Sequence, residues 1–442
     1  MKLKIHRGTN QIGGNIVEVA TDTTKIMLDC GQNLPPLDDP KAEDNIDIPG
    51  LTSGKNAFDA VFISHHHGDH CGLLGRINDE IKVYMSEITK NVLEITADFV
   101  GKPAPSVHKV LVPRNPESIG DITVTPLPVK HSAWGAMMFL VQSGETKLLY
   151  TGDFNDIDED DYKILENIDI LLCEGTNVKA NRNDTEDTVQ TDAKNIMEQT
   201  KGDVFVLCST TNLNRVKAID AACLECNPPR KMVFDTFMNA ILQNVDCKLE
   251  SKTLQFLPHS VIKGKNRRME KYIAWAEEDA LDWRTYTGAA NIAKRKNLTF
   301  MVRPTMEGFL IRLGGHKVGI EPPEGKQKDY LEYRASVIAK KPFVGSTLIY
   351  SIWRGYENTG QTAVFLDFCR SLGMDVEYLH VSGHAYREQL ESSVVRLNPK
   401  ILVPIHTENP ENYHEFKGMR DKVIQLNQGE ILDCVNGVVI DG

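Results

Sequence analysis

The sequence contains no uninterrupted apolar run that approaches the roughly 18 residues needed to span a bilayer. Its first residues, MKLKIHRGTNQIGGNIVEVA, carry charges inside the first apolar stretch and lack the long apolar core of a secretory signal peptide. Internal repeats and low-complexity tracts are also missing. We therefore expect a cytoplasmic, globular protein that has no membrane partner.

Cysteine is scarce and follows no pairing pattern. The chain has nine cysteines, an odd number, and most of them lie in apolar runs, as buried thiols do in a reducing compartment. The CLEC segment at 223–226 is a CxxC motif, but it lies in a helix-like stretch without a second cysteine pair. This pattern favours core cysteines over a zinc knuckle or a redox motif.

Positive charge is in deficit overall, because the formal net charge is −11. Such a chain does not have a surface that coats nucleic acid indiscriminately. The charges are unevenly distributed, since residues 181–365 carry 27 Lys and Arg against 22 Asp and Glu, whereas the flanking segments carry 23 against 39. A basic middle within an acidic frame fits an anionic substrate approached from one side, although chance could also produce this difference.

Short apolar strands alternate with amphipathic helices, which is typical of a layered α/β fold. In the first part of the chain the runs TKIMLDCG, AVFISHHH, TKLLYTGDF and IDILLCEGT all end in polar residues. From about residue 181 the pattern changes to longer helices and βα units, and after about residue 365 strands with polar ends return. A chain of 442 residues is also long for a single core. We therefore expect two domains.

The segment AVFISHHHGDHCGLL, residues 60–74, places four histidines and one aspartate directly after an apolar strand. Alternate residues of a strand point to one side, so His65 and His67 can converge on one ion while His66 points away. Gly68 permits a turn that aims Asp69 and His70 at a neighbouring point. Nitrogen and carboxylate ligands of this kind suit zinc, or manganese where water completes the coordination.

Further ligand residues stand at the ends of other apolar runs. These are His131 in PVKHSAWG, Asp153 in LLYTGDF and His406 in ILVPIHTENP. Each would be weak alone, but the three share one context, an apolar strand followed by a ligand residue. The Asp153 carboxylate could bridge two ions.

These motifs resemble a known family. HHHGDH, KHSAWGAM, YTGDF and IMLDCG are similar to the motifs of the metallo-β-lactamase fold, and LLCEGTN, SGHA and VPIHTE are similar to the additional motifs of the β-CASP nucleases, in particular the ribonuclease J-like enzymes. The resemblance covers nearly the whole chain. It implies an αββα sandwich formed by residues 1–180 and 366–442, with an inserted α/β β-CASP domain at residues 181–365.

The resemblance also implies roles for individual residues. The first metal ion would be bound by His65, His67 and His131. The second would be bound by Asp69, His70 and His406, with Asp153 as the bridge. Asp29 would orient ligands from behind them, Glu174 and His384 would join Asp69 in catalysis, and Asn214, Arg215 and His384 would contact the substrate. His380 more simply supports its loop.

The activity implied is that of a metal-dependent ribonuclease, acting as an exonuclease or an endonuclease through a hydroxide activated by two divalent ions, with zinc favoured and manganese as the alternative. A histidine at the position of His384 is associated with RNA substrates in this family, whereas the DNA-processing branch has valine there. Basic residues of the insertion would hold flanking phosphates. The candidates besides Arg215 are Lys263, Lys265, Arg267 and Arg268 in KGKNRR, for which a solvated loop is an equal alternative.

Two departures from the family leave alternatives open. Asn214 stands where these enzymes usually have a histidine, and an amide cannot act as an acid or a cation. The chain also ends without the C-terminal domain that many of these enzymes use to dimerise, so a homodimer is neither implied nor excluded. A small-molecule metallohydrolase, a DNA-directed nuclease and a non-catalytic nucleic-acid-binding relative remain the alternative functions.

Overall fold

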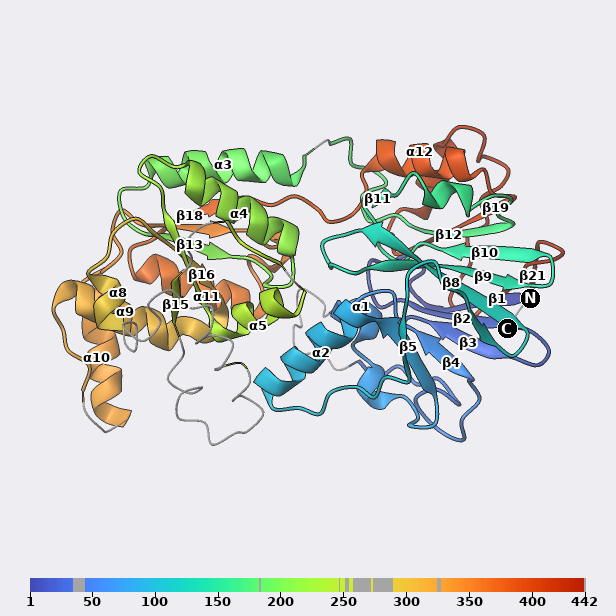
Figure 1. Cartoon of the computed structure of the whole chain (residues 1–442), viewed down its shortest axis with the longest axis horizontal. Coiled ribbons are helices and arrows are strands. Elements are labelled where there is room, and N and C mark those ends of the chain that lie inside the picture. The colour runs from blue at the N-terminus through green and yellow to red at the C-terminus, as the bar shows by residue number, and fades with distance from the viewer. Residues whose placement is uncertain are drawn as a thin grey trace.

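The computed structural model describes residues 1–34, 44–182, 184–245, 247–250, 254–256, 272, 289–323 and 327–440. Two halves lie side by side in Figure 1, a sandwich of two sheets that holds both chain ends and a second α/β layer structure beside it. The KGKNRR run lies outside the described residues. Among the residues described, no helix is both long enough and apolar enough to cross a membrane.

The first sheet of the sandwich contains both ends of the described chain. Its strand order is β21 (Val438–Ile440), β20 (Ile431–Asp433), β1 (Lys2–Arg7), β2 (Ile16–Ala20), β3 (Lys25–Leu28), β4 (Ala60–Phe62), β5 (Lys82–Ser86) and β6 (Lys109–Leu111). The strands from β3 to β6 run parallel. The polar residues after β4 therefore emerge at one edge of the sandwich.

The second sheet is built from the middle of the sandwich sequence and one late strand. Its order is β11 (Asp156–Ile157), β8 (Ile122–Lys130), β9 (Met137–Ser143), β10 (Thr146–Tyr150), β12 (Ile170–Glu174) and β19 (Ile401–Ile405), with β7 (Glu117–Ile119) paired to β8. The strands β10, β12 and β19 run parallel. Their carboxyl ends therefore meet at the same edge.

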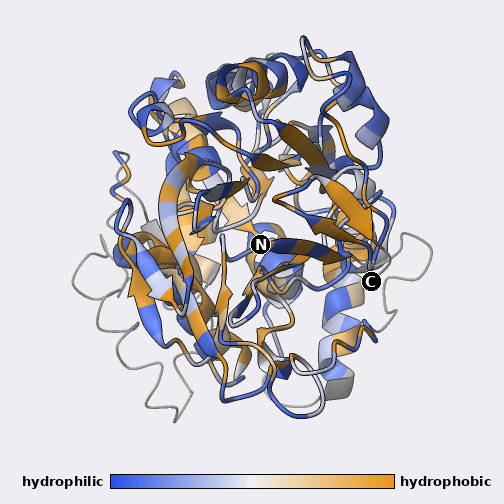
Figure 2. Cartoon of the chain, turned by 90° about the vertical axis from the view of Figure 1, so that its right-hand side faces the viewer, coloured by the Kyte–Doolittle hydropathy of each residue, from blue (hydrophilic) through white to orange (hydrophobic). Residues whose placement is uncertain are grey.

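The sandwich core lies between the two sheets, and alternate residues of their largely apolar strands face it (Figure 2). Leu3, Ile5, Val17 and Val19 of the first sheet pack there against Val124 and other residues of the second. Helix α12 (Arg387–Leu397) and the 3₁₀ turn η6 (Pro410–Glu415) cover the outer face of the second sheet. The segment around α1 (Gly68–Cys71) and η1 (Leu74–Arg76) covers the first. This is the expected αββα sandwich.

The second half is a twisted parallel sheet with helices on both faces. Its order is β15 (Leu254–Phe256), β14 (Lys231–Asp235), β16 (Leu298–Val302), β13 (Val204–Leu207), β17 (Thr347–Tyr350) and β18 (Asp375–Tyr378). One face is covered by α3 (Glu186–Gln199), α4 (Leu213–Glu225) and α5 (Thr236–Asn244). The other is covered by α8 (Ala289–Ala293), η4 (Pro304–Met306), α9 (Glu307–Val318), α10 (Gln327–Ala339) and α11 (Gly360–Ser371).

The end of the insertion differs from the expected boundary at residue 365. Helix α11 and strand β18 both belong to the core of the second half, because Phe368, Leu372 and Met374 pack there. A short strand such as β18, in which polar and apolar residues alternate, cannot be assigned to one sheet or another from its sequence alone. We therefore propose that the insertion ends at Tyr378 and that the sandwich resumes after it.

Helix α2 (Glu87–Val100) joins the two halves. It follows β5 of the sandwich, yet its Val92 and Ile95 pack into the core of the insertion. The rings of Phe99 and Phe237 lie 5.0 Å apart, and the Tyr272 hydroxyl donates a hydrogen bond to Asp98. The apolar face of α2 therefore helps to fix the insertion against the sandwich.

Candidate metal centre

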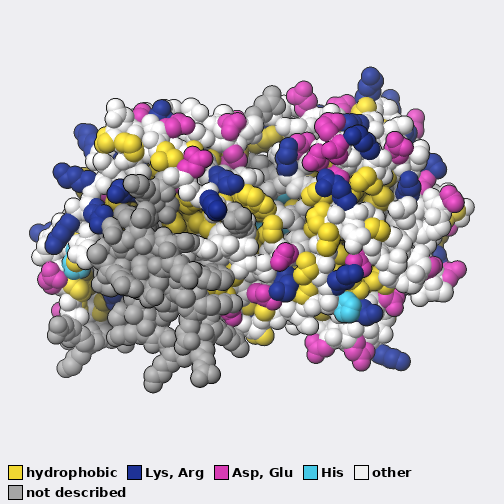
Figure 3. Space-filling view, viewed as in Figure 1, with side chains coloured by type: hydrophobic (Ala, Val, Ile, Leu, Met, Phe, Trp, Pro, Cys, Tyr) yellow, Lys and Arg dark blue, Asp and Glu magenta, His cyan; other side chains and the backbone are white. Residues whose placement is uncertain are grey.

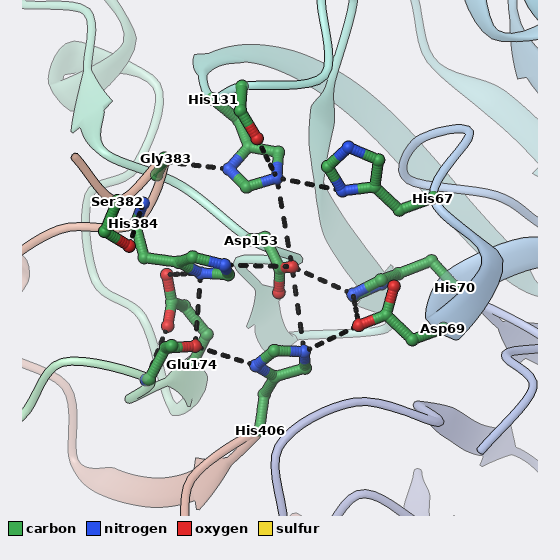
Figure 4. A network of polar contacts seen from close by, with 12 residues as sticks. His67, Asp69, His70, His131, Asp153, Glu174, Ser382, Gly383, His384 and His406 are labelled. Carbon is green, nitrogen blue, oxygen red and sulfur yellow. Dashed lines mark hydrogen bonds and ion pairs between the residues drawn. The ribbon is translucent and has the colours of Figure 1, made fainter. Parts of the chain in front are cut away.

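Polar side chains follow the carboxyl ends of four sandwich strands and meet at one point. His65 and His67 follow β4, and the short helix α1 brings Asp69 and His70 back toward them. His131 follows β8, Asp153 follows β10 and His406 follows β19. The structure thus brings all seven predicted ligands together, although they are drawn from both sheets. Figure 4 shows this cluster with every predicted ligand except His65 labelled.

The Asp153 carboxylate lies at the centre of this cluster. Its Oδ2 atom lies within 4.0 Å of the Nε2 atoms of five histidines, at 3.0 Å from His70, 3.7 Å from His406, 3.8 Å from His65, 3.9 Å from His384 and 4.0 Å from His131. Asp153 is also buried. A carboxylate in this place can bridge two ions.

Among the described residues, two of the four groups of side chains that could hold an ion match the predicted sets. One group holds His65, His67 and His131, and the other holds Asp69, His70, Asp153 and His406. The distance from His131 Nε2 to His67 Nδ1 is 3.4 Å, and that from His406 Nε2 to Asp69 Oδ2 is 3.3 Å. Two ligands of one tetrahedral zinc ion lie about 3.3 Å apart, given bonds of about 2.0 Å. Both groups therefore fit one ion each.

Buried polar atoms provide a second test of this fit. The Nε2 atom of His65 and the Oδ1 atom of Asp153 are buried and have no hydrogen-bond partner among the described residues. Buried polar groups almost always have a partner, and a cation supplies one for both an imidazole nitrogen and a carboxylate oxygen. The set of donors therefore suits divalent metal ions.

Asp29 holds several groups behind the cluster. Its Oδ2 atom accepts hydrogen bonds from His70 Nδ1, the Tyr150 hydroxyl and the Ser64 hydroxyl, each at 2.7 Å. The bond to His70 fixes the ring so that Nε2 faces Asp153. The structure thus places Asp29 in the predicted position. Tyr150 was not anticipated, although it stands inside the quoted run TKLLYTGDF.

Glu174 and Thr176 hold the two histidines that come from the later part of the chain. The Glu174 carboxylate accepts from His384 Nδ1 at 2.9 Å and from the Thr176 backbone amide at 2.8 Å. The Thr176 hydroxyl lies 2.9 Å from Nδ1 of His406 and 3.1 Å from Nδ1 of His384. Glu174 is fully buried, so it acts on His384 and not on a substrate. Thr176 is a site residue that the sequence reasoning missed, although the motif LLCEGTN contains it.

Three of the proposed ligands have pKa values shifted toward the form that binds metal, whereas His70 has the opposite shift, because the carboxylates of Asp153 and Asp29 outweigh burial and raise its pKa well above the usual value. Burial, together with neighbouring imidazoles, lowers the pKa of His65 and of His131 well below the usual histidine value. Burial alone would raise the pKa of Asp153, but the positive charge of His406 and His70 holds it well below its usual range. Neutral imidazole and ionised carboxylate are the ligand forms of these side chains.

His384 has the opposite shift. Burial lowers its pKa, but the carboxylates of Glu174 and Asp153 outweigh burial and raise it to about 9. Its side chain is 17% exposed, whereas that of Asp153 is 1% exposed. His384 therefore lies on the open side of the cluster.

The backbone at two of these residues adopts a left-handed conformation that non-glycine residues rarely adopt. The φ angle is 61° at Asp29 and 53° at His406. The chain also approaches itself closely there, since a Cβ atom added at Gly31 would lie 1.8 Å from the Asp69 carbonyl oxygen. Such positions concentrate at functional sites, where surrounding contacts hold them.

The insertion touches the metal cluster through the start of α4. Asn212 caps this helix and also forms a β-bridge with Ala133, two residues after His131. Asn214 is exposed on the next turn, so a contact with substrate stays a prediction for it.

The expected contact between Arg215 and the substrate is wrong. Its side chain is fully buried, and the guanidinium donates to Glu186 at 2.7 Å, to the Ser351 hydroxyl at 2.5 Å and to the Val381 carbonyl at 3.0 Å. A guanidinium with these partners is not available to a phosphate. Arg215 instead ties α4 to the loop after β18, which carries His384.

Four other histidine and cysteine residues agree with the simpler interpretations. His66 belongs to neither ligand group. The Nδ1 atom of His380 accepts a hydrogen bond from Arg215 at 3.4 Å. Burial, together with the charge of Arg215, lowers the pKa of His380 to about 4. Both observations agree with a role of His380 in supporting its loop. Cys223 and Cys226 are buried in the core with Met197, and their thiols point to the Met197 sulfur.

Family comparisons agree with this geometry. A beta-lactamase superfamily domain matches residues 24–207, and a Zn-dependent metallo-hydrolase RNA specificity domain matches residues 371–414. The chain belongs to the metallo-β-lactamase superfamily. The first match contains the β4, β8 and β10 ligands of this metallo-β-lactamase protein, and the second contains His384 and His406.

The curated relatives of the chain narrow the comparison to ribonuclease J. It is 21% identical to ribonuclease J of Helicobacter pylori (strain B128) over 91% of its own length and 55% of the relative. It is 21% identical to ribonuclease J of Corynebacterium glutamicum over 97% of its length and 57% of the relative, and 24% identical to that of Sinorhizobium meliloti over 93% and 70%. It is thus a ribonuclease J-like, β-CASP protein that spans about half the length of the curated relatives it matches.

A solved structure shares the whole fold. The crystal structure of a protein of unknown function from Enterococcus faecalis V583 superposes with a TM-score of 0.68 at 19% identity, and covers 99% of both chains. The arrangement of sandwich and insertion therefore occurs in another protein of matching extent. Cytoplasmic location and the homodimer stay predictions.

Proposed function

We propose that this protein hydrolyses phosphodiester bonds of RNA with the help of two divalent ions, zinc in preference to manganese. The observation that carries this proposal is the central position of the Asp153 carboxylate, within 4.0 Å of five imidazole Nε2 atoms. The matched RNA specificity domain and the ribonuclease J relatives support RNA as the substrate.

His65, His67 and His131 would hold one ion, and Asp69, His70 and His406 the other, with Asp153 between them. When bound, such ions lower the pKa of a water and offset the negative charge that develops on a phosphoryl oxygen. The protein's own contribution is to fix the ligand directions. His70 is held through Asp29, His131 through the Gly383 carbonyl at 2.9 Å, and His406 through Thr176.

His384 would contact the phosphate directly. Its Nδ1 atom is bound by Glu174, so Nε2 is the atom that faces Asp153. Because His384 is more exposed than the buried ligands His70, Asp153 and His406, a phosphate at the ions would meet its Nε2 atom. From there it can donate a hydrogen bond to a non-bridging oxygen or to the leaving oxygen. Glu174 is the residue that positions it.

The surface beside the site is compatible with a polyanion. On the face shown in Figure 3, lysine and arginine side chains lie on both halves next to the boundary between them, and apolar side chains lie between these charges. Basic groups of this kind bind phosphates whatever the base sequence, and apolar surfaces accept the bases.

The test is to incubate the zinc-loaded protein with end-labelled RNA, single-stranded DNA, a lactone and a thioester. We expect RNA to be cleaved in preference to the other three and cleavage to stop when a chelator removes the metal. The Asp153→Asn variant should lose activity, whereas Asp160→Asn, a change at an exposed aspartate, should keep it. Hydrolysis of the lactone or thioester without RNA cleavage would establish the small-molecule alternative, and preference for DNA would overturn the choice of RNA.

A further inference from the structure

An exposed aromatic segment lies at the carboxyl edge of the inserted sheet. Strands β17 and β18 are parallel neighbours, with Tyr350 paired to Tyr378 at their ends. The chain after β18 runs directly to His384, and the chain after β17 enters the 3₁₀ turn η5 (Arg354–Tyr356). Ligands of open parallel sheets bind outside these carboxyl ends. The η5 turn is therefore on the edge that delivers His384 to the metal centre.

One contact fixes the position of this turn. The Arg354 guanidinium lies over the Tyr378 ring, 4.2 Å from its centroid, at the start of the loop that carries His384. This contact places η5 beside that loop.

Trp353 is held in place although it is half exposed. Its indole ring packs edge-on against Tyr356, with centroids 5.2 Å apart, and half of the residue's surface (50%) is open to solvent. Its carbonyl accepts hydrogen bonds from the Tyr350 hydroxyl at 2.8 Å and the Tyr356 amide at 3.1 Å. A Cβ atom added at Gly355 would lie 2.0 Å from the indole, so the ring lies directly over that glycine. A large aromatic ring held at the surface leaves one face open on which another ring can stack.

We propose that Trp353, supported by Tyr356 and Arg354, is a stacking platform for unpaired bases of an RNA strand whose scissile phosphate lies at the metal centre. An aromatic face beside a guanidinium is the usual means by which proteins hold single-stranded nucleic acid without reading its sequence. This inference rests on the proposed function, because it assigns a binding site for the same substrate.

The test measures binding of a fluorescent, single-stranded RNA of about ten nucleotides. Its linkages are phosphorothioates that resist cleavage, and the protein is zinc-loaded and full length. We expect Trp353→Ala to weaken binding about tenfold, as the loss of one stacked base would. Trp353→Phe should retain most of the affinity. Gly355→Ala should weaken binding as well, because it moves the indole without removing it.

The control is Leu331→Ala, which removes an apolar side chain that is 62% exposed on α10 of the same half. It should bind RNA as the wild type does. An RNA with abasic sugars in place of its bases should bind equally to the wild type and to Trp353→Ala, since it offers nothing to stack. Equal affinity of Trp353→Ala and wild type for the normal RNA, with melting temperatures unchanged, would overturn the proposal.

The two proposals can fail separately. If the wild type cleaves RNA and Trp353→Ala cleaves it with the same KM, the platform is wrong and the proposed function stands. If the wild type binds the RNA through Trp353 but does not cleave any RNA, the proposed function is wrong and the platform stands. If the wild type does not bind RNA, the platform is wrong.

Discussion

The Oδ2 atom of Asp29 lies 2.7 Å from Nδ1 of His70, at the base of the candidate metal centre. Both side chains are fully buried, and the burial is balanced by the hydrogen bonds that Asp29 accepts from Ser64 and Tyr150. This contact sets which nitrogen of His70 faces Asp153. The orientation of the ligands therefore depends on a residue that is itself no ligand.

Replacing Asp29 by asparagine should weaken zinc binding by about 10- to 100-fold, because the amide removes the charge that orients His70. Competition with a chromophoric chelator would measure the affinity of each protein for zinc. The matched change Asp22→Asn alters an exposed aspartate and should leave affinity unchanged. Unaltered zinc affinity in Asp29→Asn would show that His70 is oriented by other contacts.

The Thr176→Val variant should bind zinc less tightly and cleave RNA more slowly, because valine has the shape of threonine but cannot accept from His384 and His406. We expect about a tenfold loss in each quantity. Thr176→Ser keeps the hydroxyl and should restore both. If valine and serine behave alike, the threonine has only a packing role.

Arg215 should matter for stability and not for direct contact with RNA. Arg215→Met keeps much of the apolar stem but leaves Glu186 and the Val381 carbonyl without their partner, so the free energy of unfolding should fall by about 3 kcal/mol. Urea unfolding would measure this. Lys217→Met, a change at an exposed residue two positions further along α4, should have little effect. A large loss of RNA affinity in Arg215→Met with unchanged stability would contradict a purely structural role for Arg215.

Much of the metal cluster could be predicted because its signal is local. Alternation along a strand brings His65 and His67 to one side, and a ligand that follows an apolar run, such as Asp153, stands at a predictable sheet edge. Thr176 could not be assigned in this way. Its importance comes from two histidines that lie 208 and 230 residues further along the chain.

In the insertion too, the features that the sequence did not predict depend on contacts between distant residues. A basic residue after a strand is typical of a phosphate contact, but burial decides its role, and burial depends on how α4 packs against distant loops. Arg215 was therefore assigned wrongly. The end of the insertion was also set too early, because a short strand of alternating polar and apolar residues such as β18 can join either sheet system.

Gly31 should tolerate no side chain. A Cβ atom there would meet the Asp69 carbonyl oxygen at 1.8 Å, and this backbone atom also accepts from the Asn15 amide at 2.9 Å, so it has little freedom to move. Gly31→Ala should reduce the free energy of unfolding by about 3 kcal/mol and weaken zinc binding, since Asp69 would be displaced. Gly75→Ala adds a Cβ atom that meets nothing within 4 Å and should leave both quantities unchanged.

Stability in acid should depend on Asp44. Burial opposes the ionised form, but hydrogen bonds from Arg7 at 2.8 Å and from the Asn33 amide at 2.7 Å hold the pKa of Asp44 below its usual value. A lowered pKa in the folded state contributes stability that is present above the unfolded value of about 3.9 and is lost as the pH falls through the folded value. Asp44→Asn should therefore lower the free energy of unfolding by about 1 kcal/mol at neutral pH, and the difference from wild type should shrink below about pH 4.

Urea unfolding of both proteins between neutral and acidic pH would measure this difference. Asp79→Asn, at an exposed aspartate, is the control and should follow the wild type. A constant difference at every pH would show that Asp44 acts through packing alone.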